Sequence, residues 1–182
     1  MTAQAFFAIA DTAEQRLCRF ANRGCRRTTI RTLFRVVSRL GDGVFWYTLI
    51  AIMPFIFGLN RLQDGLLASL HMLCAGAIGL LMYKLLKKKL VRERPFISFD
   101  AIHCAMPPLD RYSFPSGHTL HAVLFTSLAI AYVPELTSFL VIFATLVATS
   151  RVVLGLHYPS DVLVGAVLGW LVARLSWVIV SL

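Results

Sequence analysis

The chain has 182 residues, of which 58% are hydrophobic and only 15% are charged, and its mean hydropathy is +0.73. Its apolar residues lie in nearly charge-free runs of about 16 to 22, the length that a helix needs to cross about 30 Å of hydrocarbon. These values exclude disordered, collagenous and ordinary globular proteins, and they indicate an integral membrane protein.

Basic residues outnumber acidic ones by 18 to 9, which gives a net charge of +9. For a chain sunk largely in lipid, the anionic partners that this charge predicts are headgroups or a phosphorylated substrate, and no nucleic acid is expected. The first ten residues lack the basic segment of a cleavable signal peptide. Neither a zinc site nor a disulfide framework is indicated, because no C-x-x-C spacing joins the four cysteines, Cys18, Cys25, Cys74 and Cys104.

The N-terminal region, residues 1–43, predicts two amphipathic helices. The first has a weak apolar pattern over 6–20. The second, over 28–40, carries an arginine at every fourth position from Arg27 to Arg39 and apolar residues on its other face. We expect these helices to lie in the membrane interface. A glycine-flanked Asp42 then predicts a helix break and a cap for the next helix.

Residues 44–182 predict one transmembrane domain, so the expected fold is an all-α, multi-pass bundle of about five to six spans with interfacial helices before it. The clear spans are 44–59, 66–86, 116–133, 136–150 and 161–182. Because successive helices alternate in direction, the two long polar connections should emerge at one membrane face and the two tight turns at the other. Gly165 and Gly169 predict close helix packing.

Every residue suited to chemistry lies in or beside the long connections. Lys87, Arg94 and Arg151 can clamp an anion, because guanidinium groups bind oxygens in pairs and a lysine adds a point charge. Ser116 and Gly117 open a helix, where free N–H groups point at an anion. Phosphate is the ligand that such a set suits.

Phosphoryl transfer also needs a nucleophile and a proton for the leaving oxygen, and two histidines can divide these tasks. His157 precedes Asp161 by four residues at a helix start, so the carboxylate can reach one imidazole nitrogen and leave the other free to attack phosphorus. His118, beside the Ser-Gly turn, is then the acid that protonates the departing oxygen.

These three motifs, in this order, resemble the signature of the type 2 phosphatidic acid phosphatase (PAP2) superfamily, in its membrane lipid phosphatase branch. The resemblance implies a phosphate site formed by Lys87, Arg94, Ser116, Gly117 and Arg151. It also implies that His157 becomes phosphohistidine, that Asp161 orients it and that His118 is the general acid. The chain departs from the six-span members in showing five clear spans.

We therefore expect a membrane phosphatase that hydrolyses a lipid phosphomonoester or diphosphate without a metal or other cofactor. The resemblance suggests phosphatidic acid, phosphatidylglycerol phosphate or undecaprenyl diphosphate, and the small size favours the last. One alternative is haloperoxidase chemistry, because vanadium haloperoxidases share the motif pattern, although they are soluble. The other is a non-catalytic binder of anionic lipid, which would not need His157 beside an aspartate. The oligomeric state stays open.

Several nearby residues have a simpler interpretation than catalysis. Four cations flanking the first motif are interpreted as interfacial side chains that snorkel to the headgroups: Lys84, Lys88, Lys89 and Arg92. His71 and His121 are expected to pack between helices, and His103 and Cys104 to lie in a solvated loop.

Two patterns disagree on which way the site faces in the cell membrane. Positive charge gathers on the side of the predicted site, and the positive-inside rule would place that side in the cytoplasm. Resemblance to bacterial membrane members implies an outward site instead. Because basic residues at a phosphate site have a chemical reason to be there, we expect the outward orientation.

Overall fold

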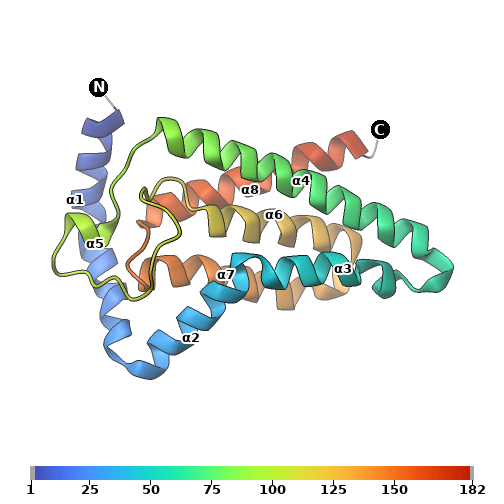
Figure 1. The fold of residues 1–182 in the computed structure, drawn as a ribbon, viewed down its shortest axis with the longest axis horizontal. Helices are drawn as coiled ribbons and strands as arrows, with labels where there is room; N and C mark the ends of the chain where they lie inside the picture. The colour runs from blue at the N-terminus through green and yellow to red at the C-terminus, as the bar shows by residue number, and fades with distance from the viewer. Residues whose placement is uncertain (1–2, 181–182) are drawn as a thin grey trace.

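The computed structural model describes residues 3–180, and within them the secondary structure is entirely helical (Figure 1). The all-α fold predicted from the hydropathy pattern is confirmed. In chain order the α-helices are α1 (Ala3–Asn22), α2 (Thr28–Arg39), α3 (Phe45–Phe57), α4 (Leu62–Lys89), α5 (Pro95–Ser98), α6 (Gly117–Tyr132), α7 (Thr137–Val153) and α8 (Pro159–Val180).

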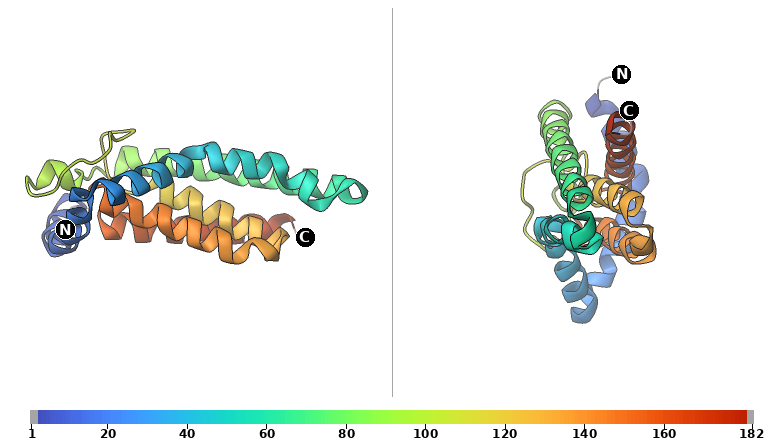
Figure 2. Two further views of the ribbon diagram at one scale, coloured as in Figure 1. Left: turned by 90° about the horizontal axis from the view of Figure 1, so that it is seen from below. Right: turned by 90° about the vertical axis from the view of Figure 1, so that its right-hand side faces the viewer.

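The long helices α3, α4, α6, α7 and α8 lie side by side in an elongated bundle, seen along and across its length in Figure 2. Helix α6 is central and packs against α4, α7 and α8. The core contains Trp46, Met72, Leu124, Leu128 and Leu140, each at most 1% exposed. Many apolar side chains of the outer helices are exposed instead, which suits helices that face lipid.

Helices α6 and α8 pack closely because α8 presents glycines to the backbone of α6. A Cβ atom on Gly165 would lie 2.6 Å from the carbonyl oxygen of Ser116, and one on Gly169 would lie 2.2 Å from that of Leu120. No side chain fits at either position. The predicted packing role of these glycines is confirmed, and it brings the start of α8 against the Ser116 turn.

Four helical stretches are long and apolar enough to span a membrane: Thr28–Phe57, Leu59–Lys89, Pro134–Val153 and Pro159–Val180. The expected span over 116–133 is helix α6, which has only 16 residues and a length of about 24 Å. The count of five to six spans is therefore not confirmed. Because other helices surround much of α6, its length need not match the lipid thickness. Residues 181–182 of the last expected span lie outside the described residues.

The predicted break between α2 and α3 is confirmed at Gly43, but the predicted cap by Asp42 is wrong. A π-helical turn over Leu40–Val44 joins the two helices, and Gly43 has a φ of 124°, which only glycine adopts easily. The helix is kinked there, and Asp42 does not cap α3. Its carboxylate turns to His118 on α6 instead.

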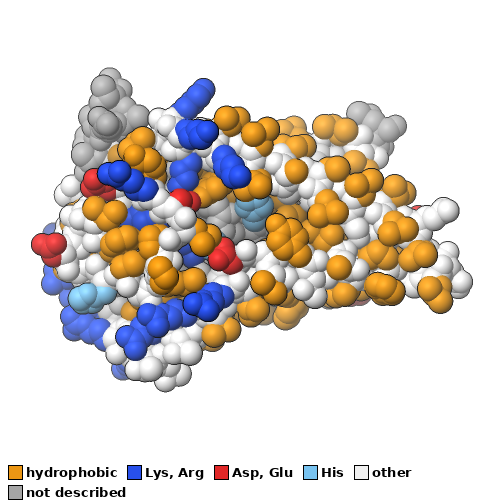
Figure 3. Space-filling model, in the orientation of Figure 1, with side chains coloured by type: hydrophobic (Ala, Val, Ile, Leu, Met, Phe, Trp, Pro, Cys, Tyr) orange, Lys and Arg blue, Asp and Glu red, His pale blue; other side chains and the backbone are white. Residues whose placement is uncertain are grey.

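The polar end of the molecule carries α1, α2 and both long connections, and the two tight turns lie at the opposite end, as predicted (Figure 1). Lys and Arg side chains gather at this end, and hydrophobic side chains cover the rest of the visible face (Figure 3). The buried Asn22 amide fastens α1 to the bundle. It donates to the carbonyls of His103 and Val153, each at 3.0 Å, and accepts from the His103 N–H at 2.9 Å.

Candidate active site

Three cations from three separate segments meet at the polar end of the bundle. Lys87 comes from the last turn of α4, Arg94 from the residue before α5 and Arg151 from the last turn of α7. Their exposures are only 9%, 1% and 2%, respectively. Buried cations are rare unless they serve an anion, so this cluster has the charge that a phosphate site requires.

His157 lies against this cluster, in the turn between α7 and α8. Its Nε2 atom is 3.4 Å from Nη1 of Arg94, and its backbone N–H donates to the Arg151 carbonyl at 3.1 Å. The turn depends on Gly155, which has a φ of +76° and lies so close to the His103 carbonyl that a Cβ atom would clash. The imidazole therefore directs Nε2 toward the cations.

The other imidazole nitrogen, Nδ1, is 3.6 Å from Oδ2 of Asp161. This distance is longer than a normal hydrogen bond. The carboxylate is held elsewhere, because Oδ2 accepts from the Tyr158 N–H at 2.9 Å and Oδ1 pairs with Arg92 at 2.6 Å. The structure thus brings the predicted pair together, with Asp161 fixed more firmly by other groups than by His157.

Burial, and then the positive charges of Arg151, Arg94 and Lys87, hold the pKa of His157 well below its ordinary value of 6.5. The imidazole is therefore neutral at pH 7, the form that a nucleophile needs.

The acid limb of the kcat/KM profile should consequently lie below pH 6.5. A depressed pKa keeps His157 neutral as the pH falls through 6.5, so activity is lost only when the pH reaches the lower value. The check is a kcat/KM profile from which the separately measured ionisation of the substrate phosphate is subtracted. An acid limb of the enzyme itself at or above pH 6.5 would contradict a depressed pKa for His157.

The Ser116-Gly117 turn differs in detail from the prediction. The Ser116 N–H donates to the carbonyl of Asp161 at 3.1 Å, so it is not free for an anion in this structure. The Ser116 hydroxyl pairs with that of Thr119 at 2.9 Å. Helix geometry leaves the N–H groups of Gly117 and His118 without intrahelical partners, and these are the available donors of the turn.

Asp110 was not predicted as part of the site, yet its carboxylate contacts two of the three cations. Oδ1 lies 2.6 Å from Nζ of Lys87 and 2.7 Å from Nη2 of Arg94, and the Tyr83 hydroxyl donates to Oδ2. Burial raises the pKa of Asp110, but the hydrogen bonds from Lys87 and Tyr83 and the nearby charges outweigh burial and leave the pKa below its ordinary value. The carboxylate is thus ionised at neutral pH and offsets part of the positive charge.

Asp42 is a second residue that sequence reasoning missed in this role. Its Oδ1 atom is 2.9 Å from Nε2 of His118. Burial and the charge of Arg151 lower the pKa of His118 below its ordinary value, and the Asp42 carboxylate opposes them by favouring the protonated imidazole, which is the form that donates a proton. The sequence carries no signal for this contact, because Asp42 is 76 positions away and also suits a helix cap.

The interpretation of Arg92 as an interfacial snorkelling side chain is wrong. Arg92 is only 2% exposed. Its guanidinium lies 2.6 Å from Asp161 and 2.7 Å from Asp11 on α1, and it also donates to the Ser160 hydroxyl. Glu14 lies 3.5 Å from it. Arg92 therefore links the N-terminal helix to the carboxylate beside His157.

The remaining expectations hold for the flanking lysines and for His71, whereas His121 bonds within its own helix and lines the groove described below. The lysines that flank the first motif are exposed: Lys84, Lys88 and Lys89. His71 pairs with the Tyr132 hydroxyl at 2.7 Å, which is a helix-packing role. His121 bonds the Gly117 carbonyl at 2.9 Å through Nδ1. Within the described residues, no group of three or more His, Cys, Asp or Glu side chains could hold a metal ion.

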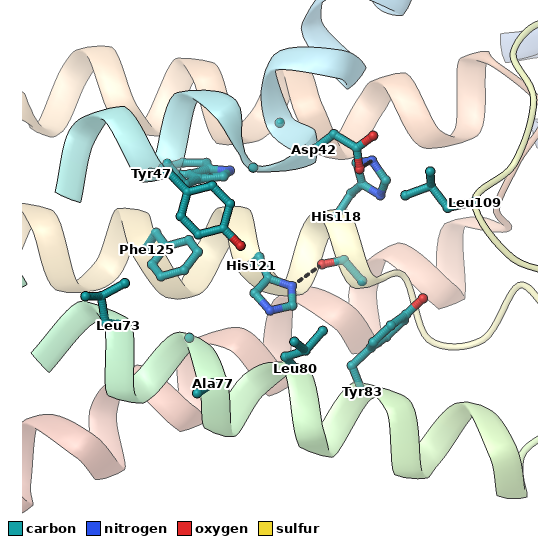
Figure 4. A pocket seen from close by; sticks show the side chains of 15 residues that line it. Asp42, Tyr47, Leu73, Ala77, Leu80, Tyr83, Leu109, His118, His121 and Phe125 are labelled. Carbon is teal, nitrogen blue, oxygen red and sulfur yellow. Dashed lines mark hydrogen bonds and ion pairs between the residues drawn. The ribbon is translucent and has the colours of Figure 1, made fainter. Parts of the chain in front are cut away.

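A groove of about 380 Å³ adjoins the site between α3, α4 and α6. Figure 4 shows it from His118 and Asp42, past His121, to Phe125 and Leu73. Its walls are mostly apolar, with polar groups gathered near His118. The arrangement suits a ligand with a polar head at the cations and an apolar chain along the groove.

The fold and the site define a helical membrane protein whose polar end gathers buried cations beside a histidine. The chain belongs to the PAP2 superfamily, whose sequence model matches residues 65–182. The family assignment made from the three motifs is confirmed.

Several curated relatives are named as lipid phosphatases. The undecaprenyl-diphosphatase BcrC of Bacillus subtilis is 31% identical over 137 residues, covering 71% of this chain and 67% of that protein. The decaprenylphosphoryl-5-phosphoribose phosphatase of Mycobacterium tuberculosis is 31% identical over 139 residues, with coverages of 74% and 72%. Phosphatidylglycerophosphatase B of Haemophilus influenzae is 41% identical over 71 residues, which are 34% of this chain and 30% of that protein.

Two solved structures share the fold. The Bacillus subtilis transmembrane PAP2 type phosphatidylglycerolphosphate phosphatase aligns with a TM-score of 0.71 and 26% identity, over 98% of this chain and 94% of that one. LpxE of Aquifex aeolicus aligns with a TM-score of 0.75 and 24% identity, over 91% and 94%, and this likeness concerns the fold alone. Together with the apolar helices, these neighbours establish a membrane protein.

Proposed function

We propose that this chain removes a phosphate group from a membrane lipid through a phosphohistidine on His157. The observation that supports this proposal is the setting of that imidazole: it is neutral, its Nε2 faces Arg94 at 3.4 Å, and two further buried cations stand beside it. Lys87, Arg94 and Arg151 would hold the phosphate oxygens, with the N–H groups of the Gly117 turn as additional donors.

In the first step, Nε2 of His157 attacks phosphorus and forms the N–P bond. The bond between phosphorus and the lipid oxygen breaks, and its electron pair leaves with that oxygen. His118 gives this oxygen a proton, and Asp42 stabilises the imidazolium before the transfer. In the second step, water attacks phosphorus, neutral His118 takes a proton from the water, and inorganic phosphate leaves as the N–P bond breaks.

The substrate is a lipid because of where the site lies. The cations sit at the ends of helices whose apolar side chains are exposed along the bundle, so a phosphate can reach them while its tail stays in the bilayer. The groove between α3 and α4 gives that tail a path toward His118. Catalysis in this scheme uses protein cations and needs no metal or other cofactor.

A phosphate-release assay of the purified full chain in detergent tests the proposal. We expect hydrolysis of at least one lipid phosphate from a panel that includes phosphatidic acid and polyprenyl diphosphate. We also expect the activity to survive EDTA and to be inhibited by vanadate, which mimics phosphate in transfer. Inactivity on every lipid phosphate would refute the function. Loss in EDTA with recovery in zinc or magnesium would refute the metal-free mechanism.

The site is proposed to face away from the cytoplasm in the cell membrane, and Cys104 provides the test. Its side chain is exposed in the connection that carries the site, whereas Cys18 and Cys25 are buried and the exposed Cys74 lies within the span Leu59–Lys89. A membrane-impermeant maleimide should label Cys104 in intact spheroplasts, and Cys104→Ser should abolish this labelling. Labelling of Cys104 only after membrane disruption would place the site inside.

A further inference from the structure

The groove beside His118 receives the part of the substrate that leaves. In the proposed reaction, His118 protonates the oxygen that departs from phosphorus, so the leaving group is released at the groove's polar end. His118, His121 and Phe125 follow one another along α6, and the groove continues with them toward the hydrophobic part of the bundle (Figure 4).

The charge of this groove is negative at the end where the leaving group would stand. Asp42 lines the groove with its carboxylate 2.9 Å from His118, and none of the described lining residues is a lysine or an arginine. The other polar side chains that line the groove are two phenols and an imidazole, from Tyr47, Tyr83 and His121. The Tyr83 hydroxyl donates to Asp110 and accepts from Lys87 at 3.0 Å, so Lys87 borders the groove through Tyr83 while it is paired with the Asp110 carboxylate at 2.6 Å.

Two cations act on Asp42 from outside the groove lining, namely Arg151 and Arg39. Arg151 belongs to the buried cluster and donates to the Ser38 hydroxyl. Arg39 is an exposed side chain at the end of α2. The cations of the site are thus gathered around the phosphate that is attacked, and none of the described groove-lining residues adds a lysine or an arginine for a second phosphate.

We propose that the site selects lipid phosphomonoesters whose leaving group is an uncharged alcohol, and that it discriminates against lipid diphosphates. This inference rests on the proposed function. A monoester releases a neutral alcohol into the groove once His118 has protonated it. A diphosphate releases a lipid phosphate, which would enter an apolar groove beside the Asp42 carboxylate, where the His118 imidazolium is already paired with that carboxylate. This inference differs from the expectation, based on the small size of the chain, that the substrate is undecaprenyl diphosphate.

Matched substrate pairs test the inference. Dioleoyl phosphatidic acid and dioleoylglycerol diphosphate share a tail and differ by one phosphate, as do farnesyl phosphate and farnesyl diphosphate. We expect kcat/KM of the purified full chain to be at least about tenfold higher for the monoester in each pair, although a phosphate is intrinsically the better leaving group. Equal or higher values for the diphosphates would overturn the inference. Inactivity on all four lipids would refute the proposed function instead.

A cation placed in the groove provides the second test. Tyr47 lines the groove but is 65% exposed, so Tyr47→Lys adds a charge without touching His118, and Tyr47→Met is the neutral control. We expect the lysine variant to raise kcat/KM for the diphosphates at least about fivefold above the methionine variant, with no such rise for the monoesters. No selective rise in a variant that elutes as folded protein would count against the inference.

Arg39 tests whether an outside cation already serves the second phosphate. Because Arg39 does not line the groove, Arg39→Gln should change kcat/KM by the same factor for both members of each pair. A loss confined to the diphosphates would show that Arg39 reaches the leaving phosphate, and it would overturn the argument that the groove lacks a counter-ion.

Discussion

Replacement of His157 by alanine is expected to lower kcat by about a thousandfold or more, because loss of a catalytic nucleophile removes the covalent route altogether. Vanadate binding should remain within a few fold of the original value. The anion is held by Lys87, Arg94 and Arg151, and the truncation removes none of these charges. The measurements are steady-state phosphate release and calorimetric titration with vanadate.

A matched control comes from His103, whose side chain is exposed in the connection near the site. His103→Ala should keep full activity, since its hydrogen bonds with Asn22 use only backbone atoms of His103. Acid quenching with a radiolabelled lipid should trap a phosphoprotein in the original chain and in His103→Ala but not in His157→Ala. A His157→Ala protein that retained more than about a hundredth of the original rate would rule out the covalent mechanism.

The sequence predicts those site residues that can be recognised from their immediate neighbours in the chain. Lys87, Arg94 and Arg151 stand next to apolar runs in which a cation is costly, so their types alone indicate an anion site. The four-residue spacing of His157 and Asp161 sets them near each other at one helix start, whatever the rest of the fold does. The structure brings these residues together at the polar end of the bundle.

The missed parts depend on contacts between distant segments. Asp42 reaches His118 only because the kink at Gly43 directs α3 alongside α6, and a lone Gly-Asp-Gly sequence equally suits a helix cap. Arg92 stands in a run of basic residues whose neighbours are exposed. Only the docking of α1, with Asp11 and Glu14, distinguishes it from them.

There is also a physical reason why the predicted span count is not confirmed. Hydropathy identifies 116–133 as a span because its residues are apolar, but a central helix is apolar for packing as much as for lipid. Leu120, Leu124 and Leu128 of α6 are buried by protein. A helix of this kind can be shorter than the hydrocarbon thickness, because it is covered largely by neighbouring helices and has little contact with lipid.

Arg92→Gln is expected to be the most damaging change outside the proposed catalytic set. It would leave the fully buried Asp161 carboxylate and that of Asp11 without their shared counter-ion, and breaking a buried ion pair typically costs about 3 to 5 kcal/mol of stability. Because Asp161 would then shift relative to His157, we expect kcat to fall by about a hundredfold, the loss that a 1 Å displacement can cause. Thermal unfolding in detergent and steady-state kinetics measure the two effects.

Two comparisons separate a positioning role from a purely structural one. Lys89→Gln removes an exposed cation from the same segment and should leave stability and kcat unchanged. Arg92→Lys should recover little, because one ammonium nitrogen cannot reproduce the separate guanidinium contacts with Asp11, Ser160 and Asp161. If Arg92 only supports folding, the Arg92→Gln sample should contain fewer active molecules, counted by phosphoprotein formation, each with the original turnover. If it positions Asp161, every correctly folded molecule should turn over slowly, and an unchanged rate per active site would refute that role.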